Sequence, residues 1–161
     1  MDSLSSLLIP FRNQGPLVRL PEGYLLLSEE GPPDLADLDR LLGACGEAAR
    51  GEERWRLVLE RSAWHLMVLD AAGRLVGFLR TTSDQALNAN LWDLLSDPGD
   101  PARQQVIRAL VQTALARLRR ELGGCSISLS APPEALEALR QAGFLVDPGG
   151  IRAMGLQLDQ P

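Results

Sequence analysis

The sequence is poor in cysteine, histidine and long apolar runs, and each shortage excludes a class of protein. Its two cysteines, Cys45 and Cys125, cannot form a disulfide framework and lack metal-ligand spacing, so we expect buried thiols, a reducing compartment and no metal site. The only histidine, His65, opens a predicted strand, which indicates a structural role rather than a general base. No apolar run is long enough for a bilayer span or a signal peptide, so we expect no membrane segment and a cytoplasmic location.

Positive charge is also in short supply. The 161 residues contain 16 basic and 21 acidic side chains, which gives a net charge of −5. Binding to nucleic acid or to an anionic membrane surface requires a net basic face, so both are disfavoured. We expect a protein partner and no nucleic acid, and we leave open whether the chain forms a homodimer.

The length of the chain suits one domain with a sizeable core, preceded by an arm. Residues 1–22 contain Pro10, Gly15, Pro16 and Pro21, which interrupt any regular element. We therefore divide the chain into an N-terminal arm (1–22) and a domain (23–161). The arm is either loosely attached or docks a protein partner. The apolar side chains available for docking are Leu7, Leu8, Ile9 and Phe11.

Hydrophobic periodicity predicts a mixed α/β (α+β) fold. A strand over residues 24–28 is followed by helices over 34–45 and 52–61, the first of them capped by Asp34. Apolar runs on both sides of a turn that ends at Gly73 predict a hairpin of residues 64–69 and 74–82. The remaining predictions are strands over 91–95, 125–130, 144–146 and 154–158, a long helix over 101–122 and a short helix opened by Pro132 and Pro133. This order favours a central sheet with helices on its faces.

Two separated segments resemble the cyanobacterial and plastid branch of the GNAT acetyltransferases. Residues 77–93, GFLRTTSDQALNANLWD, are similar to that branch's GFARATSDxAFNATIWD. Residues 141–154, QAGFLVDPGGIRAM, are similar to its TMGFxPDPEGIKGM. The resemblance extends from about Tyr24 to the C-terminus and implies a splayed, mixed, mostly antiparallel sheet with helices on both faces.

In that family, acetyl-CoA lies between the fourth and fifth strands, and its pyrophosphate rests on backbone amides at the opening of the long helix. A helix N-terminus suits an anion because its first N–H groups lack partners and carry the positive dipole end. The residues that the resemblance assigns to the cofactor are Leu94, Leu95, Ser96, Gln104, Gln105, Val106, Ile107 and Arg108.

The chain departs from the family at the residues that carry this chemistry. Gln105 and Ile107 replace the two glycines of the phosphate loop, and a Cβ at such positions obstructs a close anion. Asp100 followed by Pro101 is typical of a helix start, so we expect the helix to begin about one turn early, with Asp97 and Asp100 where the pyrophosphate would lie. The family's proton-donating Tyr aligns with Leu139, which cannot donate a proton.

A polar cluster remains as the candidate acceptor site. We consider Asp84, Asn88, Asn90 and Trp92 as substrate-binding residues and Asp93 as a candidate catalytic base. On a strand Asn88, Asn90 and Trp92 share one face, so these residues either line an acceptor pocket or hold a loop and the core.

Three functions follow from these observations. The first is a pseudoenzyme, a GNAT-fold protein that has lost efficient acetyl transfer and acts as a binding or regulatory module. The second is an active N-acetyltransferase that uses acetyl-CoA to acetylate a primary amine, such as a protein lysine, an N-terminus or a small amine. The third is a module that binds a protein through its opened sheet or its arm.

Overall fold

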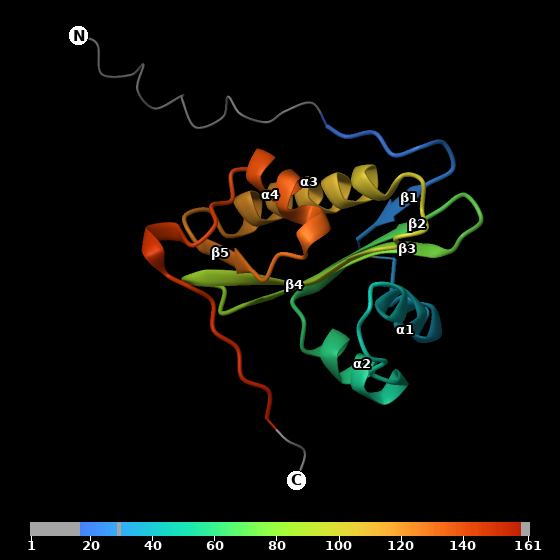
Figure 1. The fold of residues 1–161 in the computed structure, drawn as a ribbon, viewed down its shortest axis with the longest axis horizontal. Helices are drawn as coiled ribbons and strands as arrows, with labels where there is room; N and C mark the ends of the chain where they lie inside the picture. The colour runs from blue at the N-terminus through green and yellow to red at the C-terminus, as the bar shows by residue number, and fades with distance from the viewer. Residues whose placement is uncertain (1–16, 29, 159–161) are drawn as a thin grey trace.

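The computed structural model describes residues 17–28 and 30–158, and its centre is a five-stranded sheet with helices on both faces (Figure 1). The strands follow chain order, β1-β2-β3-β4-β5. Neighbouring strands are antiparallel except β4 and β5, which are parallel. The predicted mixed, mostly antiparallel sheet is therefore confirmed.

Up to the short helix α4 every predicted element is present, although β4 begins three residues before the strand predicted over 91–95. The elements are β1 (Leu25–Leu27), α1 (Leu35–Ala44), α2 (Glu52–Glu60), β2 (Trp64–Leu69), β3 (Leu75–Ser83), β4 (Asn88–Ser96), α3 (Arg103–Glu121), β5 (Ser126–Leu129), the 3₁₀ turn η2 (Pro133–Ala135), α4 (Leu136–Gln141) and the 3₁₀ turn η3 (Pro148–Gly150). The predicted cap of α1 is present, since the Asp37 N–H donates to Asp34 Oδ1 at 2.8 Å.

Each face of the sheet carries its own hydrophobic core. Helices α3 and α4 cover one face, where Leu66, Leu79 and Leu110 are completely buried. Helices α1 and α2 cover part of the other face, where Trp55 and Phe78 pack edge to face with ring centroids 6.1 Å apart. Because α1 and α2 lie under β1–β3 and under Leu95 near the end of β4, only β5 and the first half of β4 are left without a helix on that second face (Figure 1).

The long helix begins later than the sequence suggested. Asp100 is not its N-cap: α3 starts at Arg103, its N-cap is Ala102, and residues 100–102 form a turn instead. Asp100 Oδ1 accepts the Ala102 N–H at 2.7 Å, so the aspartate stabilises this turn rather than the helix itself. The helix nevertheless begins five residues before Arg108, about one turn earlier than the family motif implies.

The two C-terminal strands are a wrong prediction. Residues 144–146 and 154–158 form no strand, and β5 is the edge of the sheet. Leu145, Val146, Met154, Leu156 and Leu158 are all largely exposed. Alternation favours an extended segment, but the segment becomes a strand only where an edge pairs with it.

Part of the predicted arm lies against α3. The Val18 N–H donates to Gln112 Oε1 at 2.9 Å, and Leu20 packs on the core beside α3. The apolar arm residues Leu7, Leu8, Ile9 and Phe11 lie outside the described residues. Among the helices that the structure describes, none is long and apolar enough to cross a membrane.

Candidate functional site

Strand β4 contains a β-bulge at Asp93. Phe78 of β3 pairs with Leu95, and Arg80 pairs with Trp92, so two residues of β4 face a single residue of β3. Asp93 has a φ of 52°, a left-handed conformation that Asp and Asn tolerate better than most residues. The bulge bends β4 in its second half.

Beyond the bulge, β4 and β5 separate. Their pairing runs from Asn88 with Ser126 to Leu91 with Leu129, and β5 ends there while β4 continues to Ser96. The predicted cofactor residues Leu94, Leu95 and Ser96 lie along this opening and are buried. The splay that the resemblance implied is therefore present.

The Asp93 carboxylate is fully engaged by two arginines. Arg50, from the segment between α1 and α2, donates to both carboxylate oxygens at 2.9 and 2.7 Å, and Arg80 Nε donates at 2.5 Å. Burial raises the pKa of Asp93, but the hydrogen bonds from Arg50 and Arg80 outweigh it, so the pKa lies below its ordinary value. A carboxylate held in this way accepts a proton poorly, and the geometry gives Asp93 a structural task at the bulge.

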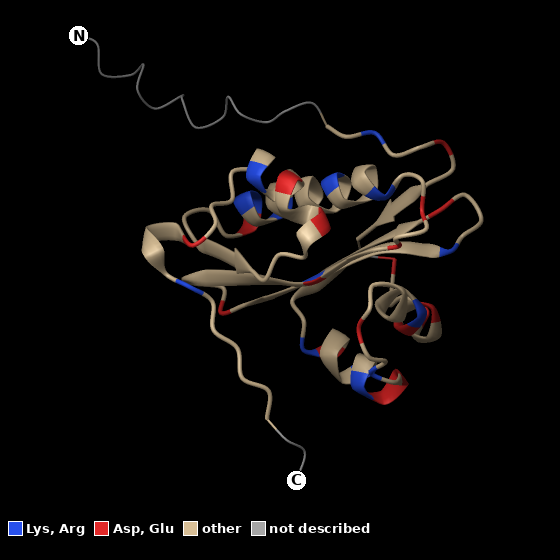
Figure 2. Cartoon of the chain, in the orientation of Figure 1, with Lys and Arg blue, Asp and Glu red and all other residues tan. Residues whose placement is uncertain are grey.

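Three of the predicted acceptor residues lie at the end of the second sheet face that α1 and α2 leave uncovered. Trp92 is 43% exposed rather than part of the core, and its indole N–H donates to Thr82 Oγ1 at 2.8 Å. The Arg80 guanidinium lies 5.7 Å from the Trp92 ring centroid, and Asn90 accepts a hydrogen bond from Ser128 at 2.6 Å. Asn88 is exposed at the start of β4. Figure 2 shows charges of both signs on the helices and mainly uncharged residues along the β4–β5 end.

Asp84 holds a loop and does not join this face. Its Oδ1 accepts the N–H groups of Ala86, Leu87 and Asn88 at 2.8–3.1 Å. These bonds close the turn between β3 and β4, which is the loop-holding alternative that the sequence left open.

At the N-terminus of α3, the backbone amides that bind phosphate in the family motif lie within the helix and are hydrogen-bonded there. The Val106 N–H donates to the Ala102 carbonyl at 3.0 Å, and Ile107 lies one residue further into the helix. Both side chains are buried in the core under β3. Gln104 and Gln105 precede the first intrahelical bond, while Arg108 is exposed on the solvent side.

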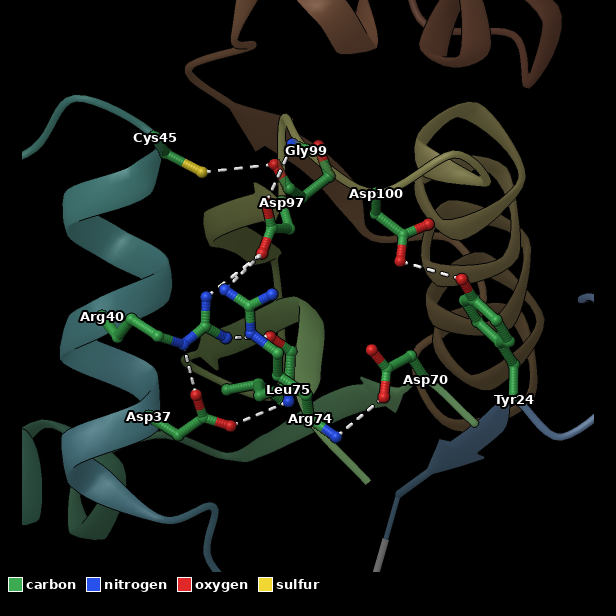
Figure 3. Close-up of polar contacts among 11 residues, drawn as sticks. Tyr24, Asp37, Arg40, Cys45, Asp70, Arg74, Leu75, Asp97, Gly99 and Asp100 are labelled. Atoms are coloured by element: carbon green, nitrogen blue, oxygen red, sulfur yellow. Dashed lines mark hydrogen bonds and ion pairs between the residues drawn. The ribbon is translucent and has the colours of Figure 1, made fainter. Parts of the chain in front are cut away.

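Asp97, which the sequence predicts beside the pyrophosphate, is paired with two arginines. Its Oδ2 is 3.1 Å from Arg40 Nη1 and 3.6 Å from Arg74 Nη2, and its Oδ1 accepts the Gly99 N–H (Figure 3). Asp100 remains at the opening of α3, where its Oδ2 also accepts the Tyr24 hydroxyl at 2.9 Å (Figure 3). The negative charge of Asp97 is thus compensated, whereas the charge of Asp100 opposes an anion there.

The thiols are half-buried, not fully buried as expected. The Cys45 Sγ donates to the Ser96 carbonyl at 3.3 Å, at the end of β4, and burial raises the pKa of this thiol. Within the part of the chain that the structure describes, no cluster of His, Cys, Asp and Glu could hold a metal ion.

The site fits only part of an acyl-CoA molecule. The pairing of β4 with β5 stops at Leu91, as an acyl-CoA site between these strands requires, but the first turn of α3 offers neither glycine nor the amides of Val106 and Ile107 to a diphosphate. Leu139, at the position of the family's Tyr, is 2% exposed and packs in the core on α4. The residues present therefore do not fit the diphosphate, and no proton donor replaces the Tyr at position 139.

Sequence reasoning missed Arg50, Arg80, Arg103 and Glu134. Arg80 pairs with Asp93 across the bulge, and Arg103 pairs with Glu134 beyond β5. No local pattern marks these residues, because each partner comes from another element.

No family model matches the chain, but individual relatives do. It is 29% identical over 131 residues to the uncharacterized N-acetyltransferase ycf52 of Porphyra purpurea, with 75% of this chain and 70% of the relative covered. It is 40% identical over 150 residues to the histone acetyltransferase TAP1 of Glycine max, covering 83% of this chain and 63% of TAP1.

Solved structures show the same fold. A probable acetyltransferase of Staphylococcus aureus, SA2161, superposes with a TM-score of 0.69 at 15% identity, covering 83% of this chain and 100% of the other. The N-acetyltransferase YhbS of Escherichia coli, determined in complex with CoA, gives a TM-score of 0.59 at 20% identity, covering 78% of this chain and 71% of the other. With its bulged β4, its splayed sheet and these relatives, the chain belongs to the GNAT superfamily of N-acetyltransferases, on the branch that contains the plastid proteins.

Proposed function

We propose that this GNAT-fold protein has lost efficient acetyl transfer and works as a binding or regulatory module. The observation that carries the proposal is the hydrogen bond from the Val106 N–H to the Ala102 carbonyl, because it withdraws a phosphate-binding amide into the helix. Losing two charge-assisted hydrogen bonds costs about 3–6 kcal/mol, which weakens binding about 100- to 10,000-fold. The absence of a proton donor at Leu139 supports the same conclusion.

Calorimetric titration with acetyl-CoA tests this proposal. We expect no saturable binding at concentrations of up to about 200 µM, whereas an active GNAT enzyme run in parallel should saturate. A dissociation constant of about 50 µM or tighter for the full chain would overturn the proposal.

A second candidate is an active N-acetyltransferase, and the specific observation in its favour is that β4 continues through Leu94, Leu95 and Ser96 after its pairing with β5 has ended. The acceptor amine would then lie on the open face at Trp92. Relatives suggest the class of amine: one is named a histone acetyltransferase, and another, from rice, is named serotonin N-acetyltransferase 2. A carboxylate base is not required, since a water molecule can take the proton.

The release of free CoA with a panel of lysine peptides, arylalkylamines and polyamines tests this candidate. The chain contains no lysine, so any acetyllysine that is formed must lie on the added peptide. Trp92→Ala is the matched variant: the exposed side chain should be dispensable for folding, and the variant should lose acceptor turnover. No CoA release with any amine counts against an enzyme.

The partner of the module is proposed to be another protein. Residues 1–16 are the segment to test, because they contain Leu7, Leu8, Ile9 and Phe11, and their removal keeps the contacts that Val18 and Leu20 make with α3 and the core. Deleting them should change the set of proteins captured by the tagged chain. An unchanged set would remove the arm from consideration and leave the opened sheet as the docking surface.

A further inference from the structure

A single arginine spans the opening between β4 and β5. Arg103, the first residue of α3, donates from Nε to Ser96 Oγ at 3.0 Å and from Nη2 to Glu134 Oε1 at 2.8 Å. Ser96 is the last residue of β4, and Glu134 lies in η2, just beyond the end of β5. The guanidinium therefore connects the two sides of the splay at its mouth.

A second hydrogen bond connects α3 with η2. Gln104 Nε2 donates to the Glu134 carbonyl at 3.3 Å, so the first two residues of α3 both contact η2. The side chains of Arg103 and Glu134 are 27% and 23% exposed. The pair is thus reachable from solvent, and an anion entering the mouth would compete with Glu134 for the guanidinium.

An arginine fork binds carboxylate and phosphate oxygens with the same geometry. Ser96 Oγ and Glu134 Oε1 already accept hydrogen bonds from two of the nitrogens of this fork, Nε and Nη2, and the Glu134 carboxylate would also repel an incoming phosphate. A repulsive group of this kind sets specificity by excluding one class of ligand while leaving others unaffected.

We propose that Glu134 is a specificity-determining residue that excludes diphosphate-bearing ligands from the opening, acting as an internal anion on Arg103. This inference rests on the proposed loss of acyl-CoA binding. It adds a second cause of that loss, the negative charge of Glu134, which a substitution can remove. A pantetheine thioester carries no phosphate, so Glu134 would not repel it.

The test compares two probes on the full chain: CoA, and S-acetylpantetheine, which lacks the diphosphate and the nucleotide. Glu134→Gln removes the charge and keeps the side-chain shape. We expect it to bind CoA at least tenfold more tightly than the wild type and to leave S-acetylpantetheine binding unchanged. Adding Arg103→Gln to this variant should abolish the gain.

Glu137→Gln is the matched control, because it removes the same charge one turn along the chain, where the Glu137 carboxylate accepts a hydrogen bond from Gln141 Nε2 at 2.8 Å. Equal gains in Glu134→Gln and Glu137→Gln would overturn the proposal, since net charge alone would then explain them. The proposal would also be overturned if Glu134→Gln, with a native circular dichroism spectrum, bound CoA no more tightly than the wild type. If Glu134→Gln misfolds, Glu134→Ala replaces it in the same measurement. Tight CoA binding by the wild type would instead overturn the proposed function, and the two failures are thereby distinguished.

Discussion

Asp93 shows why a short polar residue suits the bulge of β4. Its φ of 52° is strained for a side chain branched at Cβ, while short polar side chains tolerate this region. The bulge also leaves its carboxylate between Arg50 and Arg80, which are 43 and 13 residues away in sequence. The carboxylate therefore links the α1–α2 segment to the centre of the sheet.

Asp93→Asn should destabilise the protein by about 2–3 kcal/mol at pH 7, because two partly buried guanidiniums lose their counter-charge while the backbone keeps its conformation. The folded-state pKa of Asp93 is lowered, so its stabilisation is complete above the ordinary pKa of Asp, about 3.9, and is lost as the pH falls through the folded value. Urea unfolding at pH 7, 5 and 3 should show that the difference in free energy of unfolding between wild type and variant shrinks below about pH 4. A gap that is constant with pH would contradict the ion-pair explanation.

At the scale of elements, α3 packs on β3 at a glycine. A Cβ on Gly77 would lie 2.4 Å from Val106 Cγ1 and 3.2 Å from Leu110 Cδ1 and Val68 Cβ. Val106 is branched at Cβ and cannot rotate away freely, so helix and strand must move apart. The close approach of α3 to the sheet depends on this missing side chain.

Gly77→Ala should therefore lower the free energy of unfolding by about 1–3 kcal/mol. Gly43→Ala is the control: this glycine lies within α1 with no atom within 4 Å of an added Cβ, and the change should raise stability by about 0.5–1 kcal/mol. Thermal and urea unfolding of both variants measures the two shifts. If both variants behave alike, the packing at Gly77 is not tight.

At the N-terminus of α3, a residue that packs in the core stands where the family has a residue that binds the cofactor. Ile107, at a position where the family has glycine, is 1% exposed, whereas Gln105 at the other glycine position is exposed. Ile107→Ala should cost about 2–4 kcal/mol in urea unfolding, and Gln105→Ala less than about 0.5 kcal/mol. A small effect of Ile107→Ala would mean that the helix opening can loosen without cost to the core.

Elements with strong local signals were predictable from the sequence. The turn ending at Gly73 identified the β2–β3 hairpin, and Asp34 identified the start of α1. The start of α3 was misplaced because an Asp-Pro pair stabilises a turn as well as a helix end. The ion pairs of Asp93 and Arg103 could not be found, since they join residues 13–43 positions apart.

At the scale of the molecule, the two faces of the sheet differ in how much of each is covered by helices. One face is covered along its length by α3 and α4, while α1 and α2 leave the β4–β5 end of the other face open (Figure 1). That open end carries Trp92, and the splay opens beside it at the same strand. Any ligand that enters the splay and any partner that docks on the open face would therefore meet at β4.

The segment after Gly150 contributes little to this architecture. Its residues 151–158 are exposed, and Arg152 is 4.0 Å from Asp147 with both side chains largely in solvent. Ending the chain at Gly150 should therefore change the free energy of unfolding by less than about 0.5 kcal/mol. The truncated protein should also bind less of a hydrophobic dye, because Met154, Leu156 and Leu158 are 97, 88 and 81% exposed in the full chain.

Replacing those three side chains by Ser in the full-length protein is the control, since it removes the apolar surface without shortening the chain. It should reproduce the fall in dye binding with unchanged stability. A loss of several kcal/mol in either protein would mean that the segment pairs with β5 as the strand that its alternation favours. The β5 edge would then be covered in solution, because an exposed edge strand and an alternating apolar segment are complementary surfaces.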